Sequence, residues 1–114
     1  MRPRIAVGYL AGYDNRATKA YRLLNVGFGP VVWKTDVAQH DQTLGAIERA
    51  GLDVVALYYS HPAMDAYPTR ADAEAAGQSI LPHVVLSLYR VKSPVLKAFR
   101  VDLRNNTCSE LDVG

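Results

Sequence analysis

Leu57-Tyr58-Tyr59-Ser60-His61-Pro62 is the stretch from which we predict the organisation of the fold. With the apolar residues that precede it, from Asp53 onward, it predicts a buried strand that ends in a polar turn. Its nearly continuous apolar character is typical of a strand with helices on both sides of its sheet. Thr69-Arg70-Ala71-Asp72 follows, and a short helix is predicted from Arg70 to Ala76. A histidine at a strand end and an aspartate one turn into the next helix can point into one cleft, and both are metal-ligand types.

Apolar runs alternate with turn residues on either side of this stretch. Asp36 predicts the start of the clearest helix, over 37–50, because it has the capping-box spacing to Gln39 and Gly51 stands where a left-handed cap belongs. The other predicted elements are a strand at 5–11, its hairpin partner at 18–26, a brief extended piece at 31–33, and strands at 83–89, 95–101 and 107–111 that form an antiparallel meander. Strands at both ends with helices between them predict a single-domain α/β (α+β) fold, in which helices flank a central mixed sheet.

The composition is that of an ordinary globular domain. The 114 residues are 49% hydrophobic and 21% charged, which suits one domain with a single core. The net charge is +2 and the basic residues are scattered, so we predict no nucleic-acid binding. No apolar run approaches the ~20 residues that span a membrane. The single cysteine, Cys108, excludes an intrachain disulfide, so we expect a cytoplasmic protein without membrane association.

The motif around His61 also carries a resemblance to a known family. Ser60-His61-Pro62 and Thr69-x-x-Asp72 are preceded by Gly8-x-Leu10-x-Gly12 and followed by the apolar strands that begin at Val84 and Val95. In this order they resemble a JAMM/MPN domain, over nearly the whole of residues 1–114. The resemblance implies the cytidine-deaminase-like architecture of that family.

The resemblance also implies a metal site. In the family, two histidines and an aspartate hold a tetrahedral zinc ion with one position open for water. A glutamate acts as general base and acid, and a serine hydroxyl helps to hold the developing oxyanion. Here His61 and Asp72 match two of the metal ligands, and Thr69 matches the serine as the catalytic hydroxyl. Complete members cleave isopeptide or peptide bonds after ubiquitin-like C-termini, whereas incomplete members serve as scaffolds in larger complexes.

Two positions of the motif depart from the family pattern. Tyr59 stands where the first histidine belongs, and Ile5 stands where the glutamate belongs. A phenol has an ordinary pKa of about 10, so Tyr59 replaces an imidazole ligand poorly. We therefore expect zinc to be bound weakly or not at all, and the chain to be a catalytically inactive binding or assembly module. The alternative is a zinc-dependent metallopeptidase or isopeptidase that acts at the C-terminus of ubiquitin-like proteins.

Simpler interpretations of the same residues stay open. Thr69 and Asp72 also form a plain helix-capping pattern, and His61 suits a loop histidine bonded to the backbone. Tyr59 suits strand packing, and His83, at a predicted strand start, suits a structural role.

The expected partners are a ubiquitin-like or sulfur-carrier protein, or another JAMM/MPN chain. We expect no counterpart of the helix that the family places before its glutamate, because the first predicted strand begins close to Met1. We expect apolar surface to be left uncovered on one side of the sheet, with Phe28, Val31 and Trp33 as candidates. The isolated chain is then expected to form a homodimer or to be only marginally stable.

Overall fold

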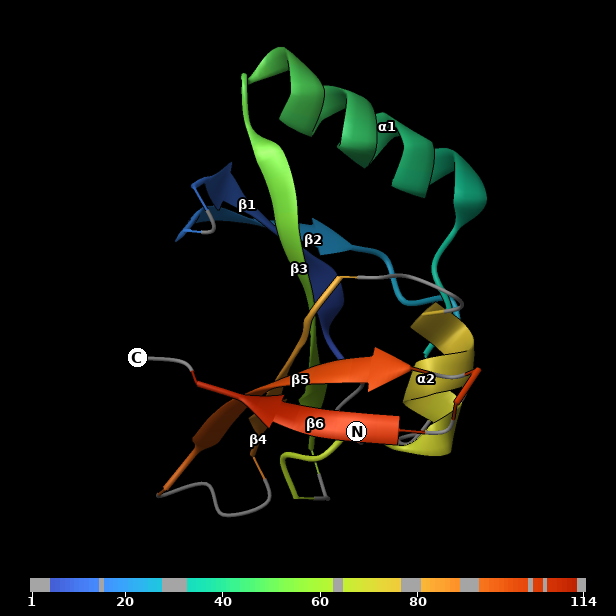
Figure 1. Cartoon of the computed structure of the whole chain (residues 1–114). Helices are drawn as coiled ribbons and strands as arrows, with labels where there is room; N and C mark the ends of the chain where they lie inside the picture. Colours follow the sequence, from blue (N-terminus) through green and yellow to red (C-terminus); the bar gives the residue numbers. More distant parts are fainter. Residues whose placement is uncertain are drawn as a thin grey trace.

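The computed structural model describes residues 5–14, 16–27, 33–62, 65–76, 81–88, 93–102, 104–105 and 107–112. These residues form a six-stranded mixed sheet with two helices (Figure 1). In chain order the elements are β1 (Val7–Tyr13), β2 (Arg16–Leu23), α1 (Val37–Arg49), β3 (Asp53–His61), α2 (Arg70–Ala76), β4 (His83–Ser87), β5 (Val95–Asp102) and β6 (Thr107–Leu111). The predicted α+β fold with a central mixed sheet is confirmed.

The strands lie in the order β2-β1-β3-β4-β5-β6, with β3 and β4 parallel and the other neighbouring pairs antiparallel. α2 lies in the connection between the two parallel strands, because parallel strands need a long crossover. The register pairs His61 with Ser87, so the ends of both parallel strands lie at the same edge of the sheet. The predicted meander of the last three strands is confirmed.

The predicted element boundaries shift by a few residues. β2 ends at Leu23 rather than at Val26, because Asn25 leaves the hairpin and forms an isolated bridge with Thr35. β3 ends at His61, so the predicted position of this histidine at the end of a strand is confirmed.

Helix α1 begins and ends with the predicted cap residues, but one half of its predicted capping box is not formed. The Asp36 side chain accepts a hydrogen bond from the Ala38 backbone N–H, as an N-cap does, and Gly51 has the positive φ of 74° expected of a C-terminal cap. The expectation that the Gln39 side chain reaches back to the Asp36 backbone is wrong. Gln39 Oε1 accepts a hydrogen bond from the Leu24 backbone N–H instead, which ties the helix to the end of β2.

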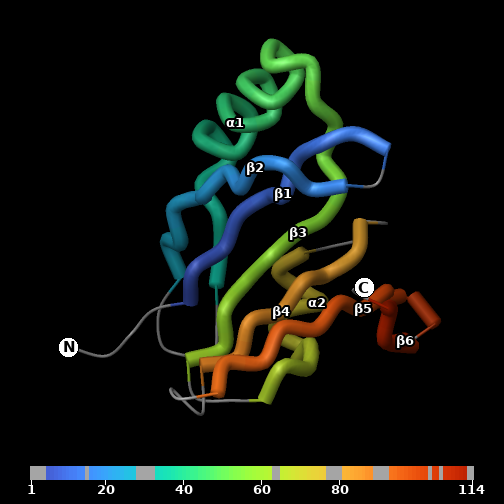
Figure 2. The backbone as a smooth tube through the Cα atoms, turned by 90° about the vertical axis from the view of Figure 1, so that its left-hand side faces the viewer, coloured from blue at the N-terminus to red at the C-terminus, as the bar shows by residue number. Residues whose placement is uncertain are grey.

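Both helices cover the same face of the sheet, which corrects the expectation of helices on both sides. Tyr9 on β1 is hydrogen bonded to His40 on α1, and His61 on β3 is hydrogen bonded to Asp72 on α2. Tyr9 pairs with Leu57, which shares a strand face with His61 because side chains alternate along a strand. Figure 2 looks onto the other face, where β3 and β4 lie in front of α2. We call this second face, which carries Tyr58, Val84 and Leu96, the open face.

The residues of β3 on the open face are partly covered by the neighbouring strands. Ala56 is small, and Ser60 Oγ accepts a hydrogen bond from the Ala6 backbone N–H. The Tyr58 ring lies over Gly8, where an added Cβ would come within 2.6 Å of the ring. The apolar run of β3 predicted helices on both sides of the sheet, but on the open face the neighbouring strands provide the cover.

The core lies between the sheet and the two helices. Its buried members are Ile5, Val7, Leu23, Trp33, Leu57, Tyr59, Ala66, Val85 and Phe99. Trp33 was expected on uncovered surface, but only 3% of it is exposed, because it packs beside Tyr59 under α2. The other two candidates for uncovered surface, Phe28 and Val31, lie outside the described residues. Neither described helix is long and apolar enough to span a bilayer.

Candidate functional site

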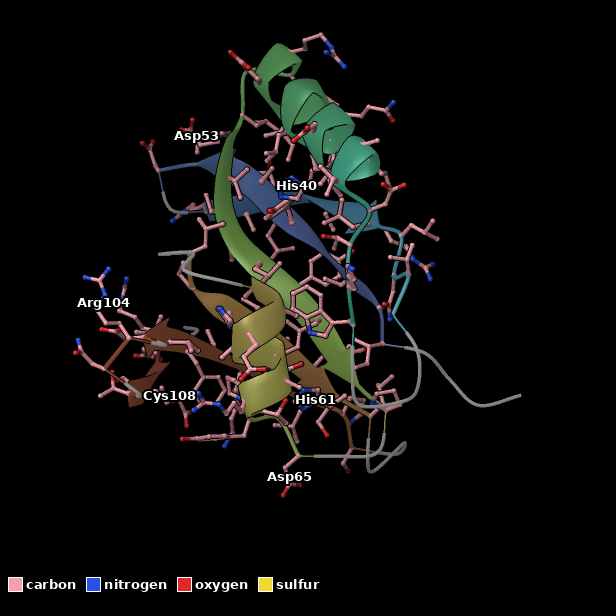
Figure 3. All side chains as sticks on the ribbon, turned by 90° about the vertical axis from the view of Figure 1, so that its right-hand side faces the viewer. His40, Asp53, His61, Asp65, Arg104 and Cys108 are labelled. Atoms are coloured by element: carbon pink, nitrogen blue, oxygen red, sulfur yellow. The ribbon has the colours of Figure 1, made fainter. Side chains whose placement is uncertain are left out.

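His61 and Asp72 meet in the core, at the end of β3 and in the first turn of α2. His61 Nε2 lies 2.7 Å from Asp72 Oδ2, and both side chains are fully buried. The structure therefore confirms that these two residues face one another. Figure 3 shows His61 beside α2, with Asp65 below it and the Asp65 side chain pointing outward.

The hydrogen bonds around His61 fix the positions of its protons. His61 Nδ1 lies 2.8 Å from the Asp65 carbonyl oxygen, which only accepts, so Nδ1 carries a proton. The contact between Nε2 and Asp72 needs a second proton between the two heavy atoms. Asp72 also accepts from Trp33 Nε1 at 2.8 Å and from the Thr69 backbone N–H at 2.9 Å, so its carboxylate is surrounded by donors. The arrangement is a buried imidazolium–carboxylate pair.

The pKa values of the pair move in the directions that favour its charged form. Burial works against the charged His61, but its hydrogen bonds to Asp72 and Asp65 raise its pKa above the ordinary value. Burial also works against a charged Asp72, but hydrogen bonds from His61, Thr69 and Trp33 lower its pKa below the ordinary value. Each partner therefore stabilises the charge of the other.

Thr69 caps α2. Thr69 Oγ1 accepts a hydrogen bond from the Asp72 backbone N–H at 3.1 Å, while Asp72 Oδ2 accepts from the Thr69 N–H. This reciprocal pair is the capping-box arrangement, so the simpler interpretation of Thr69 and Asp72 describes their contacts. The hydroxyl lies beside the buried pair, and its catalytic role stays a prediction.

Tyr59 fills the space next to His61 with a neutral phenol. Its side chain is fully buried, its ring centre lies 5.6 Å from that of His61, and its hydroxyl lies 2.8 Å from His83 Nδ1. Burial and the nearby Asp72 charge raise the Tyr59 pKa far above its ordinary value. Burial lowers the pKa of His83, so this imidazole is neutral, and its Nδ1 forms a hydrogen bond with the phenol hydroxyl. The simpler interpretation, packing for Tyr59 and a structural role for His83, describes these contacts.

Ile5 lies in the core with 1% of its surface exposed. Its side chain packs in the cluster that holds Tyr59, and its carbonyl oxygen accepts a hydrogen bond from Asn25 Nδ2 at 3.0 Å. A side chain without a titratable group thus occupies the position that the resemblance assigns to the general base.

A comparison with family models decides the relationship. Residues 3–102 match the model of the prokaryotic homologues of the JAB domain, which is most of the chain. The chain belongs to the prokaryotic JAB-domain family. The JAB domain described here therefore has the fold and the motif order that the sequence predicted.

Two named proteins are similar in sequence to this chain. The desampylase of Haloferax volcanii is 38% identical over 77 residues, which cover 65% of this chain and 55% of that protein. The CysO-cysteine peptidase of Mycobacterium tuberculosis is 28% identical over 101 residues, which cover 87% of this chain and 69% of that protein. This JAB domain thus spans about half the length of the first relative.

Two solution structures share the fold of this JAB domain. One, from Desulfitobacterium hafniense, superposes with a TM-score of 0.82 at 23% identity, and the other, from Salinibacter ruber, with a TM-score of 0.67 at 25% identity. Each match covers 96% of this chain and 76% of the other chain.

The residues of this JAB domain do not fit a three-ligand zinc site. His61 and Asp72 bind one another, and a protonated phenol, Tyr59, takes the place of the third ligand. Within the described ranges, no group of three or more histidine, cysteine, aspartate or glutamate side chains is placed to hold a metal ion. A catalytic zinc site uses three protein ligands, and each must give up its proton to bind.

Sequence reasoning missed two residues that shape the site. Trp33 Nε1 donates to Asp72 Oδ1, the oxygen that does not contact His61, and His83 is hydrogen bonded to the Tyr59 hydroxyl. Trp33 and Asp72 are 39 residues apart in the sequence, so no local pattern predicts their contact. The contact of His83 with Tyr59 follows from the parallel register of β3 and β4, in which His83 pairs with Leu57. The sequence indicated only that His83 follows Pro82 at the start of a strand.

Proposed function

We propose that this JAB domain is a catalytically inactive binding or assembly module related to zinc isopeptidases. The observation that carries the proposal is the direct hydrogen bond between His61 Nε2 and Asp72 Oδ2. The two atoms that would both face a zinc ion share a proton instead. With both side chains fully buried, the pair acts as a structural link between β3 and α2.

The chemistry of the missing groups supports this proposal. Losing a general base alone typically slows a reaction by about 10²–10⁴-fold, and Ile5 offers no base. Tyr59 would have to lose a proton that burial holds firmly, so it does not complete the ligand set. Base and ligands act as a unit, so restoring one of the two positions is expected to do little.

The proposed partner is a ubiquitin-like or sulfur-carrier protein, or another chain of this family. The names of the relatives support the first choice, since one is a peptidase for a CysO-cysteine product and the other a desampylase. A cleft of about 510 Å³ opens at the edge of the sheet next to the His61 end of β3. Its lining residues are Asp65, Ala66, Tyr67, Ser87, Ser93, Val95 and Lys97. A cleft of this size suits part of an extended peptide tail. The cytoplasm is where we expect this binding to occur.

One observation supports a second candidate, a zinc-dependent metallopeptidase. The His61 Nδ1–H donates to a backbone carbonyl, which is the arrangement that orients a zinc-ligating histidine and points Nε2 at the metal. Were zinc to displace the shared proton, His61 and Asp72 would hold it, and the ion would supply a water of lowered pKa.

Metal analysis and a cleavage assay distinguish the two candidates. The protein is purified without chelator or a histidine tag, its zinc content is measured, and ubiquitin-like fusions are then incubated with it for hours in added zinc. We expect zinc far below one equivalent and no cleavage. One equivalent of zinc, with turnover near ~1 s⁻¹ that Asp72→Ala abolishes, would contradict the proposal.

Restoring the family residues provides a positive control. The double variant Ile5→Glu with Tyr59→His is expected to gain zinc and some activity, whereas either single variant gains little. Tyr21→His is the matched control, because Tyr21 is a half-buried tyrosine on β2 away from the site. A double variant that folds and binds zinc but still cleaves nothing would show that more than these two residues has changed.

A further inference from the structure

The open face of the sheet carries a contiguous apolar surface. Tyr58 pairs with Val84 across β3 and β4, and Val84 pairs with Ala98 on β5. One row further along, Leu86 pairs with Leu96, and these two side chains are 36% and 50% exposed. Paired residues point to the same side of a sheet, so Tyr58, Val84, Leu86 and Leu96 form one patch across three strands, with the buried Ala98 beside them.

An exposed apolar patch of this kind is unusual on a folded domain. A sheet normally buries each apolar face against another layer, and the two helices among the described residues lie on the opposite face (Figure 2). Monomers rarely leave a contiguous apolar patch of more than a few hundred Å² in water. The patch does not involve His61 or Asp72, so a binding role for it is independent of the fate of the zinc site.

Two arginines flank the patch. Arg22 lies on β2, paired with Gly8, and Arg100 lies on β5, two residues beyond Ala98. Both are exposed, and neither forms an ion pair with a described residue. On the same side of β5, the Asp102 carboxylate is held by the Asn105 backbone N–H at 3.2 Å and by its side-chain amide at 2.8 Å. The rim of the patch therefore carries two guanidinium charges, with the Asp102 carboxylate as a single negative charge beside Arg100.

The spacing of the two arginines defines the width of a fitting partner. Four strand spacings separate β2 from β5, which is about 19 Å at ~4.8 Å per spacing. A helix with its side chains is ~10–12 Å wide, so one helix fits along β3 and β4 between the arginines. Carboxylates on both flanks of that helix would come within reach of Arg22 and Arg100.

We propose that the open face binds an amphipathic helix of a partner protein, with an apolar stripe flanked by glutamate or aspartate. The stripe covers Tyr58, Val84, Leu86 and Leu96, and the acidic flanks pair with the two arginines. A second copy of this chain fits less well, because a face-to-face dimer brings four guanidinium groups together with only one described carboxylate per copy, Asp102, to face them.

Fluorescence anisotropy with two synthetic peptides tests the proposal. β3 has nine residues and spans ~30 Å, so a helix of about 20 residues at 1.5 Å per residue covers it. Both peptides carry the same leucine stripe, and one has glutamates on its flanks where the other has lysines. The glutamate peptide is expected to bind about tenfold more tightly, as two rim ion pairs predict.

Protein variants assign the binding to this face. Leu86→Ser with Leu96→Ser is expected to abolish binding of the glutamate peptide, whereas Val37→Ser, a substitution of a 74% exposed residue on α1, leaves it unchanged. Arg22→Glu with Arg100→Glu is expected to reverse the preference toward the lysine peptide. All variants change exposed side chains, and thermal unfolding confirms that each one folds.

Four outcomes would overturn the proposal. They are no binding of either peptide, equal binding of both, binding that the serine variant retains, and a preference that the charge reversal leaves unchanged. A dimer in sedimentation that the serine variant disperses would show instead that a second copy occupies the face. Binding to phosphatidylglycerol vesicles without peptide binding would show that a lipid surface does.

Discussion

Replacing Asp72 with alanine removes the centre of the buried network. Three donors lose their acceptor, namely His61 Nε2, Trp33 Nε1 and the Thr69 backbone N–H. Breaking a buried ion pair by removing one partner costs about 3–5 kcal/mol, because the other charge is left uncompensated. A domain of 114 residues has a free energy of unfolding of roughly 6–17 kcal/mol, so the variant should fold but lose a large part of its stability.

Urea unfolding of wild type and Asp72→Ala, each with and without chelator, measures this loss. Asp65→Ala is the matched control, because its side chain is exposed and only its backbone carbonyl contacts His61. The control should stay within about 0.5 kcal/mol of wild type. The reasoning would be refuted if chelator removed the difference between wild type and Asp72→Ala, because Asp72 would then stabilise the fold through a metal.

Three further changes probe the same network. The pKa of His61 is raised above 6.5 and that of Asp72 is lowered below 3.8, so the charge of His61 stabilises fully below pH 6.5 and that of Asp72 fully above pH 3.8. The difference in unfolding free energy between wild type and Asp72→Ala should therefore be largest between pH 3.8 and pH 6.5. It should shrink as the pH falls below this range or rises through the raised His61 pKa. A difference that stays constant from pH 3 to pH 9 would contradict the charged pair. Tyr59→Phe leaves His83 Nδ1 without its hydrogen-bond partner and should cost about 1–3 kcal/mol in urea unfolding with zinc content unchanged, whereas a gain in zinc would contradict the contact. Thr69→Ala should cost about 1 kcal/mol through loss of the cap and Thr69→Ser almost none, and equal losses for both would show that the hydroxyl does not cap α2.

The sequence predicted the proximity of His61 and Asp72 better than it predicted the layers of the fold. The two residues lie on adjacent elements, a strand and the helix that follows it, so their spacing predicted that they face one another. They meet in the buried core, however, and not in the expected cleft. The expected cover on both faces of β3 is wrong for a physical reason. An apolar run indicates that a strand is covered, but Tyr58 finds its cover over Gly8 on the neighbouring strand rather than under a helix.

The contacts that the sequence could not give are the long-range ones. Gln39 has the right spacing for a capping box, yet its side chain binds Leu24, because the end of β2 passes within its reach in the fold. Trp33 and His83 reach the site only through the packing of the loop before α1 and the register of β4. Such contacts depend on tertiary geometry, which propensity and spacing do not encode.

We propose that a proton, and not a zinc ion, lies between His61 and Asp72. Nitrogen-15 NMR of the His61 ring, recorded at pH 6 with and without one equivalent of zinc, tests it directly. We predict that both ring nitrogens carry a proton in each spectrum, since Nδ1 donates to Asp65 and Nε2 faces the Asp72 carboxylate. Loss of the Nε2 proton on addition of zinc, with one ion bound per chain, would contradict the claim.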